Sequence, residues 1–197
     1  VLMGNHATTV FYGDERMNNG DASGASPDPP TFLDRDGTAI SHTSYQTTWS
    51  RHTSTLGSAS QSWKVTHNST DTSMFPRFAV NADGNYTGKT LSVSVDVWLQ
   101  SGQASDVSAV TLRLFSKVGG GSVITNVAIG NVATEDAWQT ITGTFLVTAT
   151  DAQFDIDIAC ANTIYAYLNN ISVKEVGMST TGFATAQEEP TIPQVPL

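Results

Sequence analysis

The sequence predicts an all-β fold, an antiparallel β-sandwich of the jelly-roll type. Two observations predict it: apolar residues recur at every second position in many short runs, and turn-forming residues separate these runs. In the clearest run, residues 91–99, Leu and Val occupy the odd positions, while Asp96 and Trp98 fall on the other face. No run shows the 3.6-residue period with caps that a helix requires. Many short strands of this kind in one chain of 197 residues are typical of a sandwich.

The strand-like segments follow one another along most of the chain. They are residues 8–12, 39–45, 60–66, 75–80, 91–99, 110–115, 122–129, 138–147, 154–160 and 165–176. Turn chemistry lies between them, for example at Asp36 and Gly37 and in the glycine run 119–121. This spacing predicts one jelly-roll module over residues 1–177.

Two segments depart from the alternation. Residues 13–37 contain glycines and a proline-rich run at 27–30, and they are predicted to form a long N-terminal loop. Residues 178–197 contain Pro190, Pro193 and Pro196, which favour an extended strap without internal hydrogen bonds. The sequence therefore predicts a sandwich with an extended C-terminal tail.

The composition restricts the class of partner. Lys and Arg number 9 against 18 Asp and Glu, a formal charge of −9, so the chain repels phosphate backbones and nucleic acid is not an expected partner. No stretch reaches the roughly 18 apolar residues of a membrane helix, so membrane insertion is not expected either. The single cysteine, Cys160, cannot form an internal disulfide, and packing must stabilise the domain.

Catalytic motifs are missing from the sequence. The four histidines lie in separate polar stretches without metal-ligand spacing, and no nucleophile elbow, phosphate-binding loop or dinucleotide fingerprint is present. Asp155 and Asp157 form a carboxylate pair on one strand face, but a glycosidase needs its carboxylates across a cleft. We therefore expect that the chain is not an enzyme.

Four segments in order resemble a known family. They are residues 58–66 (SASQSWKVT), 88–95 (GKTLSVSV), 138–147 (WQTITGTFLV) and 167–176 (YLNNISVKEV). Together they resemble the carbohydrate-binding modules of families 4 and 9, within the galactose-binding-like jelly rolls. Modules of this kind also occur in tailed-phage structural proteins. The resemblance spans roughly residues 45–176 and implies a jelly-roll fold with a glycan as ligand.

Trp98 is the first candidate for a glycan-binding residue. It lies opposite the Leu and Val face of its strand, beside Asp96 and Gln100. An indole stacks on the C–H face of a sugar, while polar neighbours bind the hydroxyls. The alternative is that a loop or a neighbouring subunit covers Trp98, because large aromatic residues off the core usually mark some contact.

Further glycan candidates lie off the apolar faces of other strands or at the edge of the fold pattern. They are Arg113, Asp155, Asp157, Tyr45 and Trp49. The first three are candidates for the same sheet surface as Trp98. Trp63 and Trp138 are interpreted as core residues, in phase with apolar neighbours.

The resemblance also implies a position for a structural calcium ion, with an Asp of the closing strand among its ligands. Here that position is Asn169, which keeps a carbonyl oxygen but lacks the charge that Ca²⁺ favours. The run Asp34 to Gly37 has the look of a calcium loop, but Ala39 stands where such a loop needs glycine, and an Asp-Gly turn explains it better. No cofactor is expected apart from a weakly bound structural calcium ion at this position.

Two functional interpretations remain. The first is a non-catalytic structural or adhesion module of a virion, such as a fibre, spike or decoration protein, which contacts other virion subunits or further copies of itself and in addition a glycan. The alternative is a carbohydrate-binding module of a secreted or cell-surface protein. The strap and Asn169 favour the first interpretation and a location in the virion; Trp98 and the resemblance favour the second.

Overall fold

A computed structural model describes residues 7–24, 30–33, 39–40, 43–45, 47–67, 73–79, 86–103, 107–115, 123–130, 134–148, 153–160 and 164–181. This part of the chain consists of strands, turns and irregular segments, and its strand pairings are antiparallel. The predicted all-β class is therefore confirmed. In the same residues, no helix has the length and apolar character needed to cross a bilayer.

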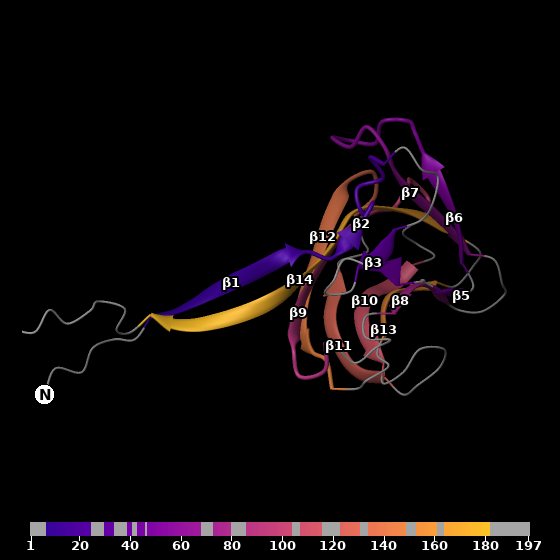
Figure 1. The fold of residues 1–197 in the computed structure, drawn as a ribbon. Helices are drawn as coiled ribbons and strands as arrows, with labels where there is room; N and C mark the ends of the chain where they lie inside the picture. Colours follow the sequence, from indigo (N-terminus) through magenta and orange to yellow (C-terminus); the bar gives the residue numbers. More distant parts are fainter. Residues whose placement is uncertain are drawn as a thin grey trace, which may run out of the picture.

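Two large sheets and one small sheet make up the fold (Figure 1). The six-stranded sheet has the order β12-β9-β14-β7-β6, with β1 also paired to β14. Its strands are β1 (Ala7–Glu15), β6 (Thr47–His52), β7 (Ser62–His67), β9 (Thr90–Trp98), β12 (Trp138–Leu146) and β14 (Tyr165–Thr181). The five-stranded sheet has the order β11-β10-β13-β8-β5. Its strands are β5 (Thr43–Tyr45), β8 (Ser73–Ala79), β10 (Val107–Phe115), β11 (Val123–Gly130) and β13 (Gln153–Cys160). The small sheet consists of β2 (Met17–Asn18), β3 (Thr31–Leu33) and β4 (Ala39–Ile40).

The core lies between the two large sheets. In β9, Leu and Val at positions 91, 93, 95 and 97 are buried, as the alternation in the sequence predicts. The aromatic rings of the facing sheet meet them: Phe154 stacks on Phe78 at 4.8 Å and lies 6.4 Å from Phe145 of β12. Trp63 is fully buried in the same cluster. Because side chains alternate, the residues between these core positions lie on the outer faces of the sandwich.

One long strand leaves the body of the sandwich. β14 pairs with β9 and β7 in its first part, and from Gly177, opposite Phe11, to Thr181, opposite Ala7, it pairs only with β1 among the described residues. β1 and this part of β14 form a two-stranded ribbon that projects from the sandwich (Figure 1). We call residues 7–13 and 176–181 the arm. The predicted boundary at 177/178 falls inside β14, because this strand continues beside β1 to Thr181.

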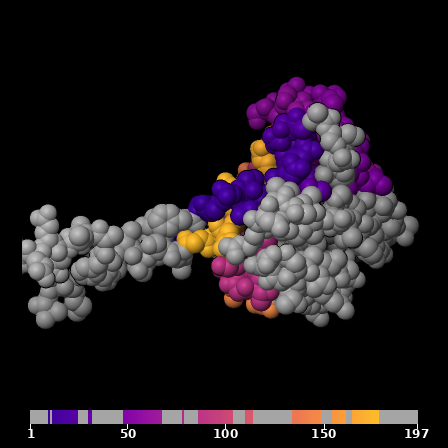
Figure 2. Space-filling view, in the orientation of Figure 1, coloured from indigo at the N-terminus to yellow at the C-terminus, as the bar shows by residue number. Residues whose placement is uncertain are grey.

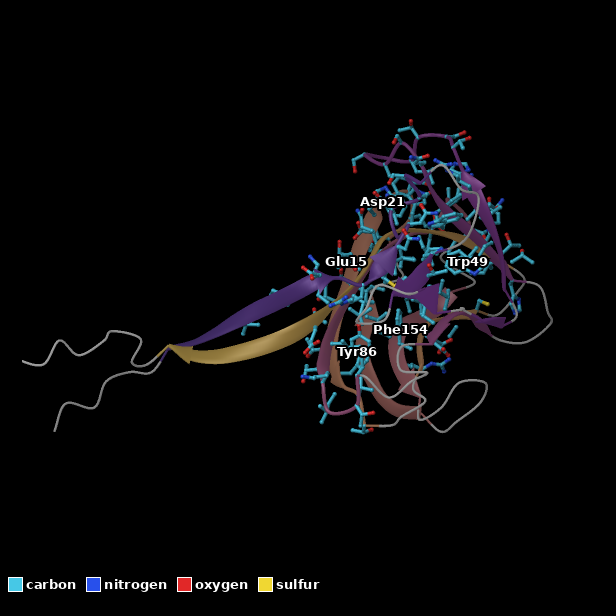
Figure 3. All side chains as sticks on the ribbon, in the orientation of Figure 1. Glu15, Asp21, Trp49, Tyr86 and Phe154 are labelled. Atoms are coloured by element: carbon cyan, nitrogen blue, oxygen red, sulfur yellow. The ribbon has the colours of Figure 1, made fainter. Side chains whose placement is uncertain are left out.

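Glu15 holds the base of the arm to the sandwich (Figure 3). Its Oε1 accepts hydrogen bonds from the backbone N–H of Met17 at 2.9 Å and of Val173 at 2.8 Å, and its other oxygen accepts the hydroxyl of Ser172. The backbone N–H of Arg16 also donates to the Val173 carbonyl at 2.8 Å. A carboxylate that receives several N–H donors forms strong hydrogen bonds, so the arm starts from a fixed point.

Two sequence expectations differ from the observed strands. The segment 13–37 is not one continuous loop, because it contains the end of β1 and also β2 and β3. Residues 47–52 form β6, which was not among the predicted strands. β6 is the edge strand of its sheet, and Trp49 is its only large apolar residue, so the alternation that marks a buried strand is weak there. The strap from residue 182 onward lies outside the described residues.

Candidate functional site

A polar cavity of about 320 Å³ lies on the outer face of the six-stranded sheet. It is lined by Asp21, Ser23, Ser58, Ala59, Ser60, Gln61, Asp96, Trp138, Asn169 and Asn170. β9, β12 and β14 form its floor, and two other segments form its walls: the turn of residues 19–24 and the loop of residues 53–61. Figure 2 shows these segments, in indigo and purple, against each other at one end of the molecule. We call this space the outer cavity.

Asp96 is fixed at the floor of the outer cavity by hydrogen bonds from two neighbouring strands. Its Oδ1 accepts the hydroxyl of Thr140 at 2.6 Å, and its Oδ2 accepts the Nδ2 amide of Asn170 at 2.7 Å. Thr140 is its direct partner in the β12 register, and β14 has a register shift between Asn169 and Ser172. Asn170 adopts a left-handed φ of 47° within this irregularity, which brings its amide to Asp96. The carboxylate is therefore preorganised at the surface of the sheet.

An aromatic row crosses the same outer face and ends at the outer cavity. Trp138, Trp98 and Tyr167 are register partners on β12, β9 and β14. The two indoles meet edge to face at 5.5 Å, and the His52 ring lies 4.7 Å from Tyr167. Trp98 and Tyr167 are only 8% and 5% exposed, whereas Trp138 is half-buried and lines the cavity. Trp138 is thus the member of the row that a ligand in the cavity can reach.

The loop of residues 53–61 covers Trp98. The Nε1 of Trp138 donates to the Leu56 carbonyl at 2.8 Å, which holds the loop down. Gly57 follows with a φ of 56°, and a Cβ built there would lie 2.9 Å from the Trp98 ring. Only glycine allows the backbone to lie this close to the indole. Trp98 therefore faces away from the core, as the sequence predicts. The loop covers its ring, however, so a sugar cannot stack on Trp98 in this structure.

The opposite wall carries a second carboxylate, Asp21 (Figure 3). Its Oδ1 accepts the backbone N–H of Ser23 at 3.1 Å and the Ser23 hydroxyl at 2.7 Å. The hydrogen bond from the Ser23 side chain lowers the pKa of Asp21, so this carboxyl is ionised at neutral pH. The turn is anchored below, where Trp63 Nε1 donates to the Asn19 carbonyl at 2.8 Å. A Cβ at Gly20 would lie 2.1 Å from the Ile171 carbonyl oxygen, so the turn packs directly on β14.

The lining of the outer cavity favours a neutral polar ligand with hydroxyl groups. Asp21 and Asp96 accept hydrogen bonds, the amides of Asn169 and Asn170 donate and accept them, and Trp138 offers an apolar surface. No Lys, Arg, His or Cys is among the described lining residues, so these residues offer neither a cationic partner for a ligand anion nor a histidine–nucleophile pair. The arrangement is suited to binding such a ligand.

Arg113, Asp155 and Asp157 lie together, but on the other side of the molecule. They belong to β10 and β13, on the outer face of the five-stranded sheet, where Arg113 is 3.4 Å from Asp155 and 3.0 Å from Asp157. The expectation that they share a surface with Trp98 is wrong, because β9 belongs to the six-stranded sheet. Asp155 is fully buried, so its charge is balanced by Arg113 within the protein.

The remaining candidates do not reach the outer cavity. Gln100 accepts the Tyr165 hydroxyl at 2.8 Å through its Oε1. Trp49 packs edge to face on Trp63 at 6.2 Å and on Phe78 at 6.1 Å, so it extends the core rather than the surface. Tyr45 belongs to β5, the edge strand of the five-stranded sheet, and its side chain lies outside the described residues.

Trp138 is the residue of the outer cavity whose face differs from the sequence prediction. It was interpreted as core, but it lies on the outer face with Thr140, while Ile141 and Phe145 of the same strand point inward. The sequence contains the signal: Trp138 is three residues before Ile141, an odd separation that places the two on opposite faces of a strand. Asp21 and the loop of residues 53–61 carry no such signal, because only the folded chain brings them to β9.

The residues at the implied calcium position do not fit a calcium ion. The Oδ1 of Asn169 accepts the backbone N–H of Asn170 at 2.9 Å, and the Asn170 amide is bonded to Asp96. Among the described residues, no group of three or more His, Cys, Asp or Glu side chains is placed to hold a metal ion. The polar side chains at this position satisfy one another instead of presenting free carboxylates to a hard cation.

Comparisons with known proteins place the chain by fold. No protein-family model and no curated protein matches it. Among solved structures, the CBM22-1 xylan-binding domain of Paenibacillus barcinonensis Xyn10C aligns with a TM-score of 0.52 and 15% identity, over 68% of this chain and 85% of that chain. The C-terminal family 22 carbohydrate-binding module of Clostridium thermocellum Xyn10B aligns with a TM-score of 0.51 and 17% identity, over 66% of this chain and 82% of that chain. The enzymatically active domain of tailspike protein 4 of bacteriophage CBA120 aligns with a TM-score of 0.45 and 10% identity, over 82% of this chain and 21% of that chain. The chain therefore has the β-sandwich fold of the carbohydrate-binding modules, as its sequence predicts.

Proposed function

We propose that this chain is a non-catalytic glycan-binding module whose ligand enters the outer cavity. The observation that carries the proposal is the meeting of Trp138, Asp96 and Asn170 on one outer face, with Asp21 opposite. A sugar ring has an apolar C–H face and a rim of hydroxyls. An indole matches the first, and carboxylate and amide groups match the second.

The size and preorganisation of the outer cavity support a short glycan segment. About 320 Å³ lies at the lower end of the range for small-molecule sites. Asp96 is already oriented by Thr140 and Asn170, so little conformational freedom is lost when a ligand binds. The xylan-binding modules that share the fold make a glycan the natural class of ligand to test.

Binding to a glycan array and titration with the best glycan would test the proposal. Asp96→Ala and Trp138→Ala should each weaken binding at least tenfold, a loss of about 1.4 kcal/mol. Thr142→Ala is the matched control, because Thr142 is exposed on the same strand and lies outside the cavity lining; its affinity should equal that of the parent. Thermal melts identify variants that fail to fold. Failure of the parent to bind any glycan, or unchanged affinity in both folded cavity variants, would refute the proposal.

We further propose that the module serves adhesion as part of a larger assembly, such as a virion fibre, spike or decoration protein. The arm supports this role, because a ribbon that projects from a sandwich offers a point of attachment away from the outer cavity. The alternative is a glycan-binding module of a secreted protein with a catalytic domain. The flanking sequence in the genome distinguishes them: further β-modules support the first role, and a glycan-active catalytic domain contradicts it.

A further inference from the structure

We propose that the arm is an assembly element that pairs with the arms of further copies of this chain, β1 of one copy beside β14 of the next. The proposal is independent of glycan binding. It starts from the observation that, among the described residues, the arm is a two-stranded ribbon with both edges free: β1 pairs only with β14, and β14 from Gly177 onward pairs only with β1. An isolated two-stranded ribbon is only marginally stable in water.

One face of the arm is apolar and exposed. Val10 and Tyr12 are 46% and 61% exposed, and the alternation of β1 places both on the same face. Val176, the register partner of Tyr12, lies on that face as well. Of the three large hydrophobic residues that are exposed in the described part of the chain, two therefore lie in the arm. An exposed apolar stripe of this kind marks a contact surface.

The edges of the arm lack the features that prevent strand pairing. Natural proteins protect free edges with charged side chains, proline or bulges. Residues 7–13 and 176–181 contain no Asp, Glu, Lys, Arg or Pro, although the whole chain carries a formal charge of −9. The β1 register is regular from Ala7 to Tyr12, and the irregularity comes only between Tyr12 and Glu15. This edge is open to pairing.

Strand direction and symmetry favour a copy of the same chain as the occupant. The arm contains no charged residue, so two arms can meet without burying a charge, although two whole chains, each with a formal charge of −9, repel one another. Rotation about an axis along the arm keeps strand directions, so β1 of one copy meets β14 of the next in antiparallel pairing, as within one copy. Repeated around the axis, this pairing closes a ring in which the free edges are paired and Val10, Tyr12 and Val176 point inward.

Light scattering of the full chain over a range of concentrations tests the proposal. For the parent, we expect the mass of two or more chains, each of 20.9 kDa. Tyr12→Lys and the double variant Val10→Lys, Tyr12→Lys should return the mass to that of one chain, because charges cannot be buried inside the ring. Leu146→Lys is the matched control: Leu146 is 51% exposed on β12, outside the arm, and its variant should keep the parent mass.

The other outcomes would overturn the proposal. A parent that stays at the mass of one chain would show that the arm does not bind copies of itself and leaves another protein's strand as the occupant. An oligomer that survives the double variant, or that Leu146→Lys dissolves equally, would place the contact elsewhere. Removal of residues 182–197 should leave the number of chains in the oligomer unchanged, and loss of the oligomer in that deletion would assign assembly to the strap. Equal melting temperatures of the sandwich in Tyr12→Lys and in Leu146→Lys would show that the loss of assembly is not a loss of fold.

Discussion

Gly57→Ala is expected to lower the free energy of unfolding by more than the cost of a positive φ alone, because its methyl group would clash with the indoles under the loop of residues 53–61. Any L-residue at its φ of 56° costs about 1–2 kcal/mol relative to glycine. The added Cβ would also lie 2.9 Å from the Trp98 ring and 3.2 Å from Trp138 Cδ1. Forcing a methyl group into such a contact costs about 1–3 kcal/mol more, because neither indole can move freely. The expected total is about 2–5 kcal/mol of unfolding free energy.

Gly88→Ala and Gly102→Ala are the matched controls. Both glycines have positive φ, 80° and 85°, and an added Cβ would meet nothing within 4 Å. They should show the backbone cost alone, and the smaller entropy of the unfolded alanine chain cancels in the comparison. Equilibrium urea unfolding measures the three losses, and near-UV circular dichroism reports the packing of Trp98 on Trp138. If Gly57→Ala lost no more stability than the two controls, the proposed tight cover over Trp98 would be wrong.

Three further predictions concern the core, pH and metal. Trp63→Ala should lose about 3–5 kcal/mol in urea unfolding, since Trp63 is fully buried; a loss below that of an exposed-site control such as Thr142→Ala would contradict its place in the core. Burial, and next the charge of Lys64, lower the pKa of His52 below 6.5. The unfolded chain therefore binds the proton more readily, and the free energy of unfolding should fall as the pH drops through 6.5 towards the folded pKa. His52→Gln should flatten this part of the stability profile, and an unchanged slope would assign it to another group. Chelation with EDTA should leave the melting temperature unchanged, because Asn169 is bonded within the protein; a drop of many degrees would restore a calcium site.

The strands could be predicted from sequence wherever one face of the strand is buried and the other carries polar residues. β9 shows this best, because its inward Leu and Val alternate with Ser and Asp, and period two determines both its type and its faces. β6 was not predicted, because a strand at the edge of a sheet needs few apolar residues. The length of β14 was underestimated because the arm has no core to face, so its alternation carries less contrast in polarity.

The candidate site was only partly predictable, because alternation assigns a face but not a sheet. Asp96 and Trp98 were placed correctly off the core, and Arg113 indeed meets Asp155 and Asp157. Which sheet each strand joins depends on long-range pairing, and this separated Arg113 from Trp98. The walls of the outer cavity depend on the same long-range folding, since Asp21 reaches β9 only after the turn of residues 19–24 packs on β14.

The pairing of Ala7 with Thr181 at the tip of the arm has a mechanical consequence. A force that pulls these two positions apart loads the antiparallel ladder at its end, so the backbone hydrogen bonds break a few at a time instead of all together. The ribbon opens like a zipper from the tip towards Glu15, where the carboxylate bonds to the Val173 N–H form the first strong stop. Until the force reaches that stop, the sandwich bears no load. Under such a load we expect the arm to yield before the sandwich does, and Glu15 marks the point at which stretching begins to strain the sandwich.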